Sequence, residues 1–268
     1  MLQLADSHRG RLSSPAVRRG AATPRGGWLD RDVEPADAVD PADPADPAGS
    51  VAPAGSADSA DFVVVLPAKP PAVGKSRLGA AAGERRHALA EAFALDTAAA
   101  CLAARRVRGV LAVTDDAALG SRLVAKGCGA IPDGDASGLN PALRQGAAEA
   151  VRRWPGARPV AVLADLPALR PADLDAALGA VAEHLRRQPD AAAYVADAAG
   201  TGTVLYTASA HRFDPAFGAG SAAAHRAAGA WPVPGELRTL RHDVDDGDDL
   251  AAAVLIGVGP ATARIASG

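Results

Sequence analysis

From Phe62 onward, short apolar runs alternate with longer Ala-rich segments, and this alternation restricts the chain to few folds. A run of about five apolar residues suits a buried strand, whereas a longer segment with apolar residues three and four apart suits a helix. The strand-like runs lie at 62–66, 109–114, 128–131 and 160–164, and the helical segments lie near 84–105, 116–126, 141–153 and 171–187. Such alternation favours a mostly parallel sheet with helices on both faces, so we expect an α/β domain over residues 61–258.

Two proline residues predict where helices begin. Asn140 followed by Pro141 is expected to form an N-cap and first helical residue, and Arg170 followed by Pro171 is expected to open the next helix in the same way.

The first sixty residues differ in composition from the rest. Residues 35–61 consist of Pro, Ala, Asp, Gly and Ser, with valine as the only larger apolar residue. Such a segment cannot bury enough apolar surface to offset its chain entropy. We therefore expect residues 1–60 to be a disordered extension, either dispensable or an interaction tail, and residues 259–268 to be a flexible tail.

The overall composition argues against several partners. The chain has 268 residues, a formal net charge of -3 and 3% aromatic residues, which is unlike a nucleic-acid-binding surface. No segment approaches the roughly 20 apolar residues of a membrane-spanning helix. Cys101 and Cys128 lack a CxxC pattern and are expected to be buried thiols in a reducing compartment. A cytoplasmic protein without nucleic-acid or membrane partners is the expectation.

A basic loop follows the first strand. Residues 62–78, FVVVLPAKPPAVGKSRL, bring Lys69, Lys75 and Arg77 to the carboxyl end of that strand, where ligands of open α/β sheets bind. The loop is not a P-loop, because Lys69 stands where GxxxxGK[ST] requires glycine, and GxGxxG is also absent. The loop is expected to bind phosphate through side-chain cations, with a solvated surface loop as the alternative.

Acidic residues follow a later strand and recur near the carboxyl end of the chain. Asp165 ends the run 160–164, and Asp243 and Asp245 flank Val244, so strand-like alternation would turn both carboxylates to one side. Magnesium prefers a few carboxylates together with substrate phosphate oxygens. We assign Asp165 and Asp243 as magnesium ligands and expect capping roles for the following acidic residues, Asp245, Asp246, Asp248 and Asp249.

A glycine-rich turn completes the pattern. Thr201-Gly202-Thr203 precedes an apolar run, and Phe217-Gly218-Ala219-Gly220-Ser221 leads into a short Ala-rich helix. Ser221 is a natural N-cap, and such a helix start can hold a phosphate or carboxylate. A plain glycine turn with a capping serine is the alternative.

Together these motifs resemble the phosphoenolpyruvate / 2-phospho-L-lactate guanylyltransferase family of coenzyme F-420 biosynthesis. The resemblance covers residues 62 to 256 and rests on PAKPPAVGKSRL, ADLPALRPADL, TGT, FGAGSAAAHRAAGA and RHDVDDGDDL, in that order. It implies a three-layer, Rossmann-like nucleotidyltransferase fold of the GT-A-like type with a mostly parallel mixed sheet. It also implies transfer of GMP from GTP to phosphoenolpyruvate, giving enolpyruvyl-2-diphospho-5'-guanosine and pyrophosphate. The same reaction on 2-phospho-L-lactate or 3-phosphoglycerate is the alternative, and the downstream transferase of the pathway is an expected partner.

The resemblance also implies roles for individual residues. Thr203, Gly218 and Ser221 would contact the phosphorylated three-carbon acid, and Asp165 and Asp243 would hold two magnesium ions. The expected contacts to GTP are made by Lys69, Lys75 and Arg77 at the triphosphate and by Asn140 near the guanosine.

Other classes of protein stay open on the sequence alone. A related enzyme could transfer a nucleotide to a sugar phosphate or a pterin, and a non-catalytic nucleotide-binding regulatory module could share the basic loop. A kinase is disfavoured by the missing P-loop glycine. No Ser/His or Cys/His pair is evident, and His225 and His242 are expected to be helix-surface or structural residues.

Overall fold

The computed structural model describes residues 61–134 and 138–267 except 69–82. The basic-loop residues Lys69, Lys75 and Arg77 and the extension 1–60 lie outside the described residues, so the predictions for them are not tested.

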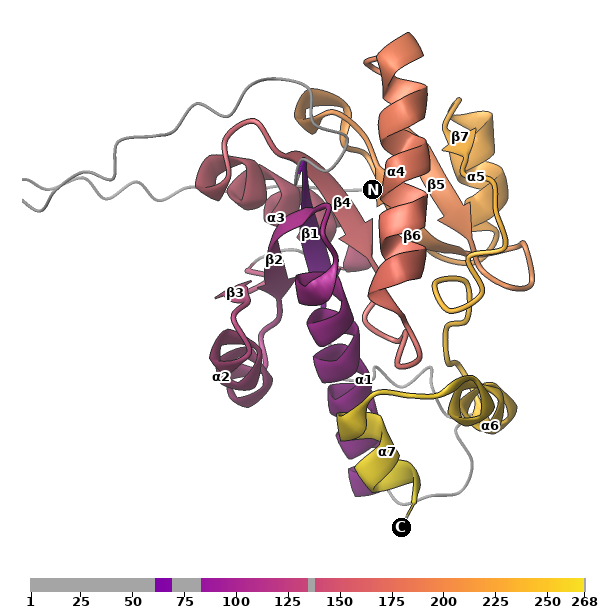
Figure 1. Ribbon diagram of the computed structural model, residues 1–268. Helices are drawn as coiled ribbons and strands as arrows, with labels where there is room; N and C mark the ends of the chain where they lie inside the picture. Colours follow the sequence, from indigo (N-terminus) through magenta and orange to yellow (C-terminus); the bar gives the residue numbers. More distant parts are fainter. Residues whose placement is uncertain (1–60, 69–82, 135–137, 268) are drawn as a thin grey trace, which may run out of the picture. The chain divides into compact units, whose positions relative to one another are not determined.

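The described strands form one mixed sheet with the order β3-β2-β1-β4-β6-β5-β7 (Figure 1). These strands are β1 (Phe62–Pro67), β2 (Val107–Val113), β3 (Gly129–Ile131), β4 (Arg158–Val162), β5 (Ala193–Ala196), β6 (Thr203–Thr207) and β7 (Trp231–Pro232). β1 to β4 are mutually parallel, while β6 runs antiparallel to both β4 and β5. The predicted mostly parallel mixed sheet is confirmed.

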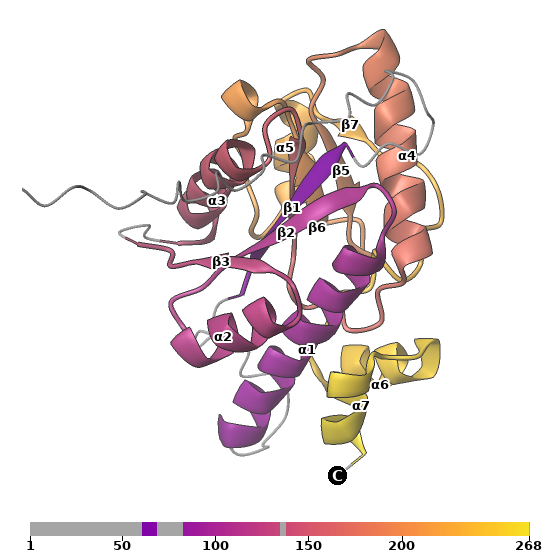
Figure 2. The same ribbon diagram turned by 60° about the vertical axis from the view of Figure 1, so that its left-hand side comes forward.

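Helices cover both faces of this sheet, which gives three layers (Figure 2). One face packs against α1, α2 and α4, and the other packs against α3 and α5. The helices are α1 (Gly83–Ala103), α2 (Ala117–Ala125), α3 (Leu139–Arg153), α4 (Pro171–Arg187), α5 (Ser221–Ala227), α6 (Gly247–Ile256) and α7 (Pro260–Ala266), with a 3-10 turn at Ala210–Arg212. None of the described helices combines the length and apolar character needed to span a membrane.

β1 lies between β2 and β4 and is buried on both sides. Val63 and Val65 join the cluster under α3, whereas Val64 and Leu66 join the cluster under α1 and α4. All four side chains are fully buried, which explains why this strand reads as a continuous apolar run and not as an alternating one. The chain winds outward from β1 in both directions, so the carboxyl ends of β1 and β4 border a switch in strand order, where ligands of such sheets bind.

The predicted bounds of the first four strands and helices agree with the structure to within two residues. One helix start differs. α3 begins after Gly138, whose φ of 116° suits glycine, so Asn140 lies inside the first turn and is not the N-cap. Pro171 opens α4 after Arg170 as expected, and Asp246 caps α6 in a capping box with Asp249.

The carboxyl-terminal segment is not a flexible tail over residues 260–266, because it forms α7 and packs against α1. The buried carboxylate of Asp96 on α1 accepts hydrogen bonds from the backbone N–H groups of Ala261 (3.0 Å) and Thr262 (2.7 Å). A carboxylate at a helix N-terminus satisfies donors that would otherwise lack partners. The prediction for this segment was wrong because it considered only the local sequence, whereas Asp96 lies far away in the chain.

We expect Gly146→Ala to destabilise the fold by about 1–2 kcal/mol, since the gain in helix propensity is smaller than the cost of overpacking. A Cβ at Gly146 on α3 would lie 2.5 Å from Val65 Cγ1 and 2.7 Å from Val113 Cγ2, both on buried strands. Chemical denaturation would measure the change. Gly247→Ala is the matched control because a Cβ there meets nothing within 4 Å. Equal stability of the two variants would contradict this account of the packing between α3 and the sheet.

Candidate active site

A cavity of about 370 Å³ lies beyond the carboxyl end of β4, where β6 begins. Its described lining comes from loops that are far apart in the sequence and consists of Leu139, Leu163, Asp165, Asp197, Thr201, Gly202, Thr203, Phe217, Gly218, Ala219, Gly220, Ser221, Asp243 and Asp245. Five residues that the sequence singled out therefore meet in one cavity, namely Asp165, Thr203, Gly218, Ser221 and Asp243.

A backbone hydrogen bond brings the two segments that carry Asp165 and Asp243 together. The N–H of Val244 donates to the carbonyl of Asp165 over 3.0 Å, and the Val244 side chain is fully buried. Burial of Val244 leaves Asp243 and Asp245 on the opposite side, where both line the cavity. The expected common orientation of these two residues is therefore found, although they lie in an extended loop and not in a strand.

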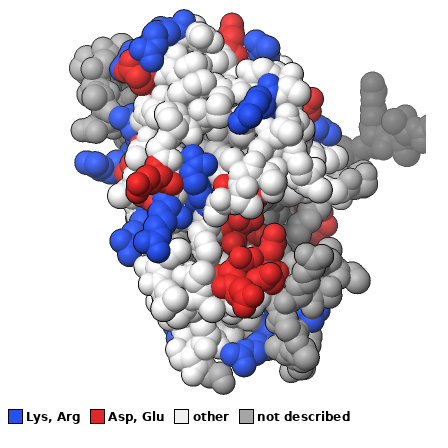
Figure 3. Space-filling view, turned by 90° about the vertical axis from the view of Figure 1, so that its right-hand side faces the viewer, with Lys and Arg blue, Asp and Glu red and all other residues white. Residues whose placement is uncertain are grey.

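The carboxylates of the cavity repel one another. Burial, followed in order of importance by the negative charges of Asp165, Asp245 and Asp197, raises the pKa of Asp243 from its ordinary value of 3.8 to about 7. The described lining residues include no Lys or Arg. Figure 3 shows a compact group of acidic side chains on this side of the molecule. Such a site favours a bound cation, because a cation removes the repulsion.

Sequence reasoning missed two of these carboxylates. Asp197 accepts hydrogen bonds from the N–H groups of Thr201 (2.9 Å) and Gly202 (2.8 Å), so it closes the turn between β5 and β6. Its position just before a glycine-containing turn was the available signal. Asp245 was expected to be a capping residue, but Asp246 and Asp249 make the capping box and Asp245 lines the cavity.

The glycine-rich turn differs from expectation at its helix start. Gly220 occupies the N-cap position with a φ of 72°, and Ser221 is the first residue of α5, so Ser221 is not the N-cap. A left-handed cap position favours glycine. The N–H groups of Ser221 and Ala222 already bond to the carbonyls of Gly218 and Thr201 (3.1 Å each). These two N–H groups are therefore already occupied, and the group at this helix start that can bind an anion in the cavity is the side-chain hydroxyl of Ser221.

Asn140 holds this turn from the facing helix α3. Its side-chain nitrogen donates to the carbonyl of Phe217 (3.0 Å), and its side-chain oxygen accepts from the N–H of Phe217 (2.8 Å). The paired bonds fix the backbone immediately before Gly218. The structure therefore places Asn140 at the edge of the acidic cavity, beside Leu139, which lines it.

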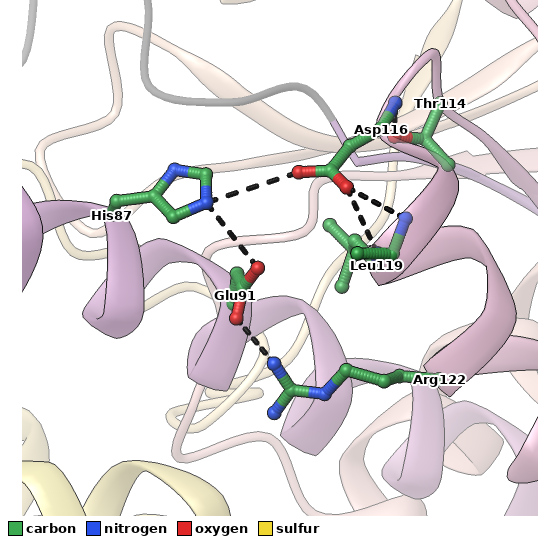
Figure 4. Close-up of polar contacts among 7 residues, drawn as sticks. His87, Glu91, Thr114, Asp116, Leu119 and Arg122 are labelled. Atoms are coloured by element: carbon green, nitrogen blue, oxygen red, sulfur yellow. Dashed lines mark hydrogen bonds and ion pairs between the residues drawn. The ribbon is translucent and has the colours of Figure 1, made fainter.

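A second polar cluster connects α1 to α2 (Figure 4). His87 Nε2 lies 3.3 Å from Glu91 Oε1 and 3.8 Å from Asp116 Oδ2, and Arg122 pairs with the other oxygen of Glu91. The ligand atoms of His87, Glu91 and Asp116 lie within 4.8 Å of one another, which is close enough for a metal ion. Since the guanidinium of Arg122 already neutralises Glu91, we assign this cluster the structural role of holding the two helices together.

The chain has a three-layer α/β fold with an acidic cavity at the carboxyl end of β4 and the start of β6, and its curated relatives show that it is a nucleotidyltransferase. A phosphoenolpyruvate guanylyltransferase of Streptomyces scabiei is 49% identical over 214 residues, covering 77% of this chain and 96% of the relative. One of Thermomonospora curvata is 48% identical over 206 residues, covering 76% and 88%. The chain belongs to the phosphoenolpyruvate guanylyltransferase family.

The remaining comparisons are less informative. No family model matches the chain. A crystal structure described as a putative nucleotide-diphospho-sugar transferase from Desulfovibrio desulfuricans has 16% sequence identity and a TM-score of 0.48, covering 73% of this chain and 96% of that one. A similarity of this extent carries no weight for function.

Proposed function

We propose that this protein transfers GMP from GTP to the phosphate of phosphoenolpyruvate, in coenzyme F-420 biosynthesis. The products are enolpyruvyl-2-diphospho-5'-guanosine and pyrophosphate. The observation that supports this proposal most strongly is the single cavity shared by Asp165, Asp243, Thr203, Gly218 and Ser221. Its volume of about 370 Å³ is at the small end for ligand sites and suits a three-carbon phospho-acid. The relatives from Streptomyces scabiei and Thermomonospora curvata are phosphoenolpyruvate guanylyltransferases, which supports this substrate.

The donor set of the cavity fits magnesium. Asp165 and Asp243 are partly buried carboxylates, and burial followed by repulsion from Asp165 raises the pKa of Asp243. Magnesium takes one or two carboxylates and completes its shell with phosphate oxygens and water. We propose that these two residues hold the ions, expected to be two, on which the substrate phosphates bind. When bound, magnesium would neutralise phosphate charge and align the nucleophile with the leaving group.

The protein itself has little covalent chemistry to perform. A phosphate monoester has its second pKa near 6, so the phosphate of the acid is already largely a dianion at neutral pH. One of its oxygens attacks the α-phosphorus of GTP, the bond from that phosphorus to the bridging oxygen breaks, and pyrophosphate leaves. No general base is needed. The roles that we assign to Thr203, Gly218 and Ser221 are to bind and orient the acid.

The remaining parts of GTP require a second region. A cavity of about 500 Å³ lies beyond the carboxyl ends of β2 and β3, with Thr114 and Pro132 in its lining. We propose that it receives the guanosine, and that Lys69, Lys75 and Arg77 contact the triphosphate. The contact of Asn140 to the guanosine stays a prediction, and both ends of its side-chain amide are bonded to Phe217 in this structure.

Pyrophosphate release would test this function directly. Purified protein with GTP and magnesium should release pyrophosphate with phosphoenolpyruvate at a higher kcat/KM than with 2-phospho-L-lactate or 3-phosphoglycerate. Omission of magnesium should abolish the signal. Faster release with either of the other acids would change the assigned substrate, and no release with any of the three would contradict the proposed reaction.

Ser221→Ala is expected to raise the KM for phosphoenolpyruvate by about tenfold, which is typical of losing a hydrogen bond to a charged group. The KM for GTP should change much less, because the buried Ser221 side chain lines the acidic cavity. Steady-state kinetics with each substrate varied in turn would measure both constants. Ser267→Ala, at an exposed position after α7, is the control. Equal changes in both KM values would show that this turn does not bind the acid.

A further inference from the structure

His225 on α5 is buried behind the acidic cavity, and the proposed reaction leaves it without a role. Its side chain is 1% exposed, so the expectation of a helix-surface residue was wrong, whereas a structural role agrees with the burial. Aromatic rings surround it, with centroids 4.6 Å away at Tyr206 and 5.7 Å away at Tyr194 and at Phe217. Burial lowers the pKa of His225, which favours the neutral imidazole.

Two hydrogen bonds determine which ring nitrogen carries the proton. The backbone N–H of Ala216 donates to Nε2 over 2.9 Å. A backbone amide can only donate, so Nε2 must offer its lone pair and the proton of the neutral ring must lie on Nδ1. Nδ1 is 3.0 Å from the hydroxyl oxygen of Thr203. That bond therefore runs from the imidazole to the hydroxyl oxygen.

This direction leaves the hydroxyl proton of Thr203 for another acceptor. A hydroxyl has one proton, and a protonated Nδ1 has no lone pair with which to accept it. Thr203 begins β6 and lines the acidic cavity. Phosphate and carboxylate oxygens accept hydrogen bonds. The Thr203 hydroxyl, which must act as a donor, is therefore already oriented for such an oxygen before a substrate binds.

We infer that His225 is a positioning residue of the phospho-acid site, which makes the Thr203 hydroxyl a hydrogen-bond donor to the substrate through the Nδ1–H tautomer of its imidazole. The inference rests on the proposed function, because it assigns Thr203 to the bound acid. The same ring also fixes the loop before the glycine turn, since Nε2 holds Ala216 while Asn140 holds the adjacent Phe217. The turn is thus fixed from α5 and from α3.

The tautomer can be measured without any substrate. In 15N NMR spectra of the full-length protein labelled at histidine, His225 should show a protonated Nδ1 and an unprotonated Nε2, assigned by the loss of these signals in His225→Asn. A protonated Nε2 would overturn the inference, whatever the enzyme turns over.

Two substitutions separate the two ring nitrogens. The amide nitrogen of Asn lies near the position of Nδ1 and can still donate to Thr203, whereas the amide oxygen of Gln reaches the position of Nε2 and can still accept from Ala216. We expect His225→Gln to raise the KM for phosphoenolpyruvate by about tenfold. His225→Asn should raise it less, and kcat at saturating acid should change little in either variant. A larger rise of the KM for phosphoenolpyruvate in His225→Asn than in His225→Gln would overturn the inference.

A double-mutant cycle tests whether the effect passes through Thr203. Thr203→Val keeps the side-chain shape and removes the hydroxyl. If His225 acts through that hydroxyl, His225→Gln should add less than twofold to the KM for phosphoenolpyruvate once Thr203 is Val, because interacting residues are non-additive. If His225→Gln raised the KM for phosphoenolpyruvate tenfold both in the wild type and in Thr203→Val, the effects would be additive and would contradict the inference. Circular dichroism and thermal unfolding would identify variants that fail to fold, for which the wild-type NMR measurement decides.

The two proposals fail in distinguishable ways. If no phospho-acid supports pyrophosphate release, the proposed function is wrong, and the tautomer spectrum still reports on His225. If release is normal but Nε2 carries the proton or the cycle is additive, only the positioning role is wrong.

Discussion

Asp165→Asn and Asp243→Asn should each lower turnover by at least ~100-fold, the scale of removing one electrostatic stabiliser of a transition state. Both side chains line the cavity of about 370 Å³, in which the described lining has no basic residue. Asparagine keeps the size of the side chain but removes the negative charge that a hard cation requires. The measurement is the initial rate of pyrophosphate release at saturating GTP, phosphoenolpyruvate and magnesium.

The matched control for this prediction is Asp248→Asn. Asp248 lies in the first turn of α6, is exposed and does not line the cavity, so its loss should affect turnover by less than a factor of about two. Wild-type-like rates in Asp165→Asn or Asp243→Asn would rule out that residue as a magnesium ligand. An equal loss of turnover in Asp248→Asn would show that negative charge near α6 matters as much as the two proposed ligands, which would contradict their specific role.

Asp243, which we propose as a magnesium ligand, should destabilise the metal-free protein. Asp243 has a folded-state pKa of about 7 against an ordinary value of 3.8, so folding favours its protonated form. Its contribution to stability is fully present below about pH 4 and is lost as the pH rises through 7. The pKa change corresponds to at most ~4 kcal/mol, and partial solvent exposure reduces this. In EDTA at pH 8, we therefore expect Asp243→Asn to be more stable than the wild type by about 2 kcal/mol.

Denaturant titrations across the pH range would measure this effect. The difference in free energy of unfolding between Asp243→Asn and the wild type should grow between about pH 4 and pH 7 and then level off. Magnesium at pH 8 should reduce it, because a ligand that binds only the folded wild type stabilises that protein. A constant difference between wild type and variant at all pH values would show that repulsion within the cavity is not the cause. Asp248→Asn should instead be slightly destabilising, since it weakens an acidic helix start.

These two effects describe one trade-off in the active site. The burial and charge crowding that raise the pKa of Asp243 are unfavourable to the empty fold and favourable to a bound cation. Stability is then gained by the substitution that removes catalysis. Proteins commonly lose stability in this way at sites that bind charged ligands.

The first half of the fold could be predicted from local patterns because apolar strand runs alternate there with longer segments of helical composition. β1 is buried on both faces, and its four central residues leave no alternative to a strand. The strands β5 and β7 were not predicted, since Ala193–Ala196 and Trp231–Pro232 are too short for a periodic signal and are strands only because β6 and β5 offer them partners. Residues 260–266 form a helix that Pro260 opens, but the contact with Asp96 that holds it against α1 has no local signal.

The amino-acid sequence by itself determined the α/β class, the order of the main elements and the chemistry of the candidate residues, because hydrophobic period and residue type are local properties. Only the tertiary structure decided which of these residues meet. The buried Val244 and its bond to Asp165 bring two distant segments, with Asp245, to one cavity, and the turn between β5 and β6 adds Asp197. The position of the proton on His225 likewise depends on the N–H of Ala216, which meets Nε2 because of the way the distant segments pack. Contacts between distant segments follow from packing, and packing depends on residues that are far apart in the chain, so no short stretch of sequence predicts it.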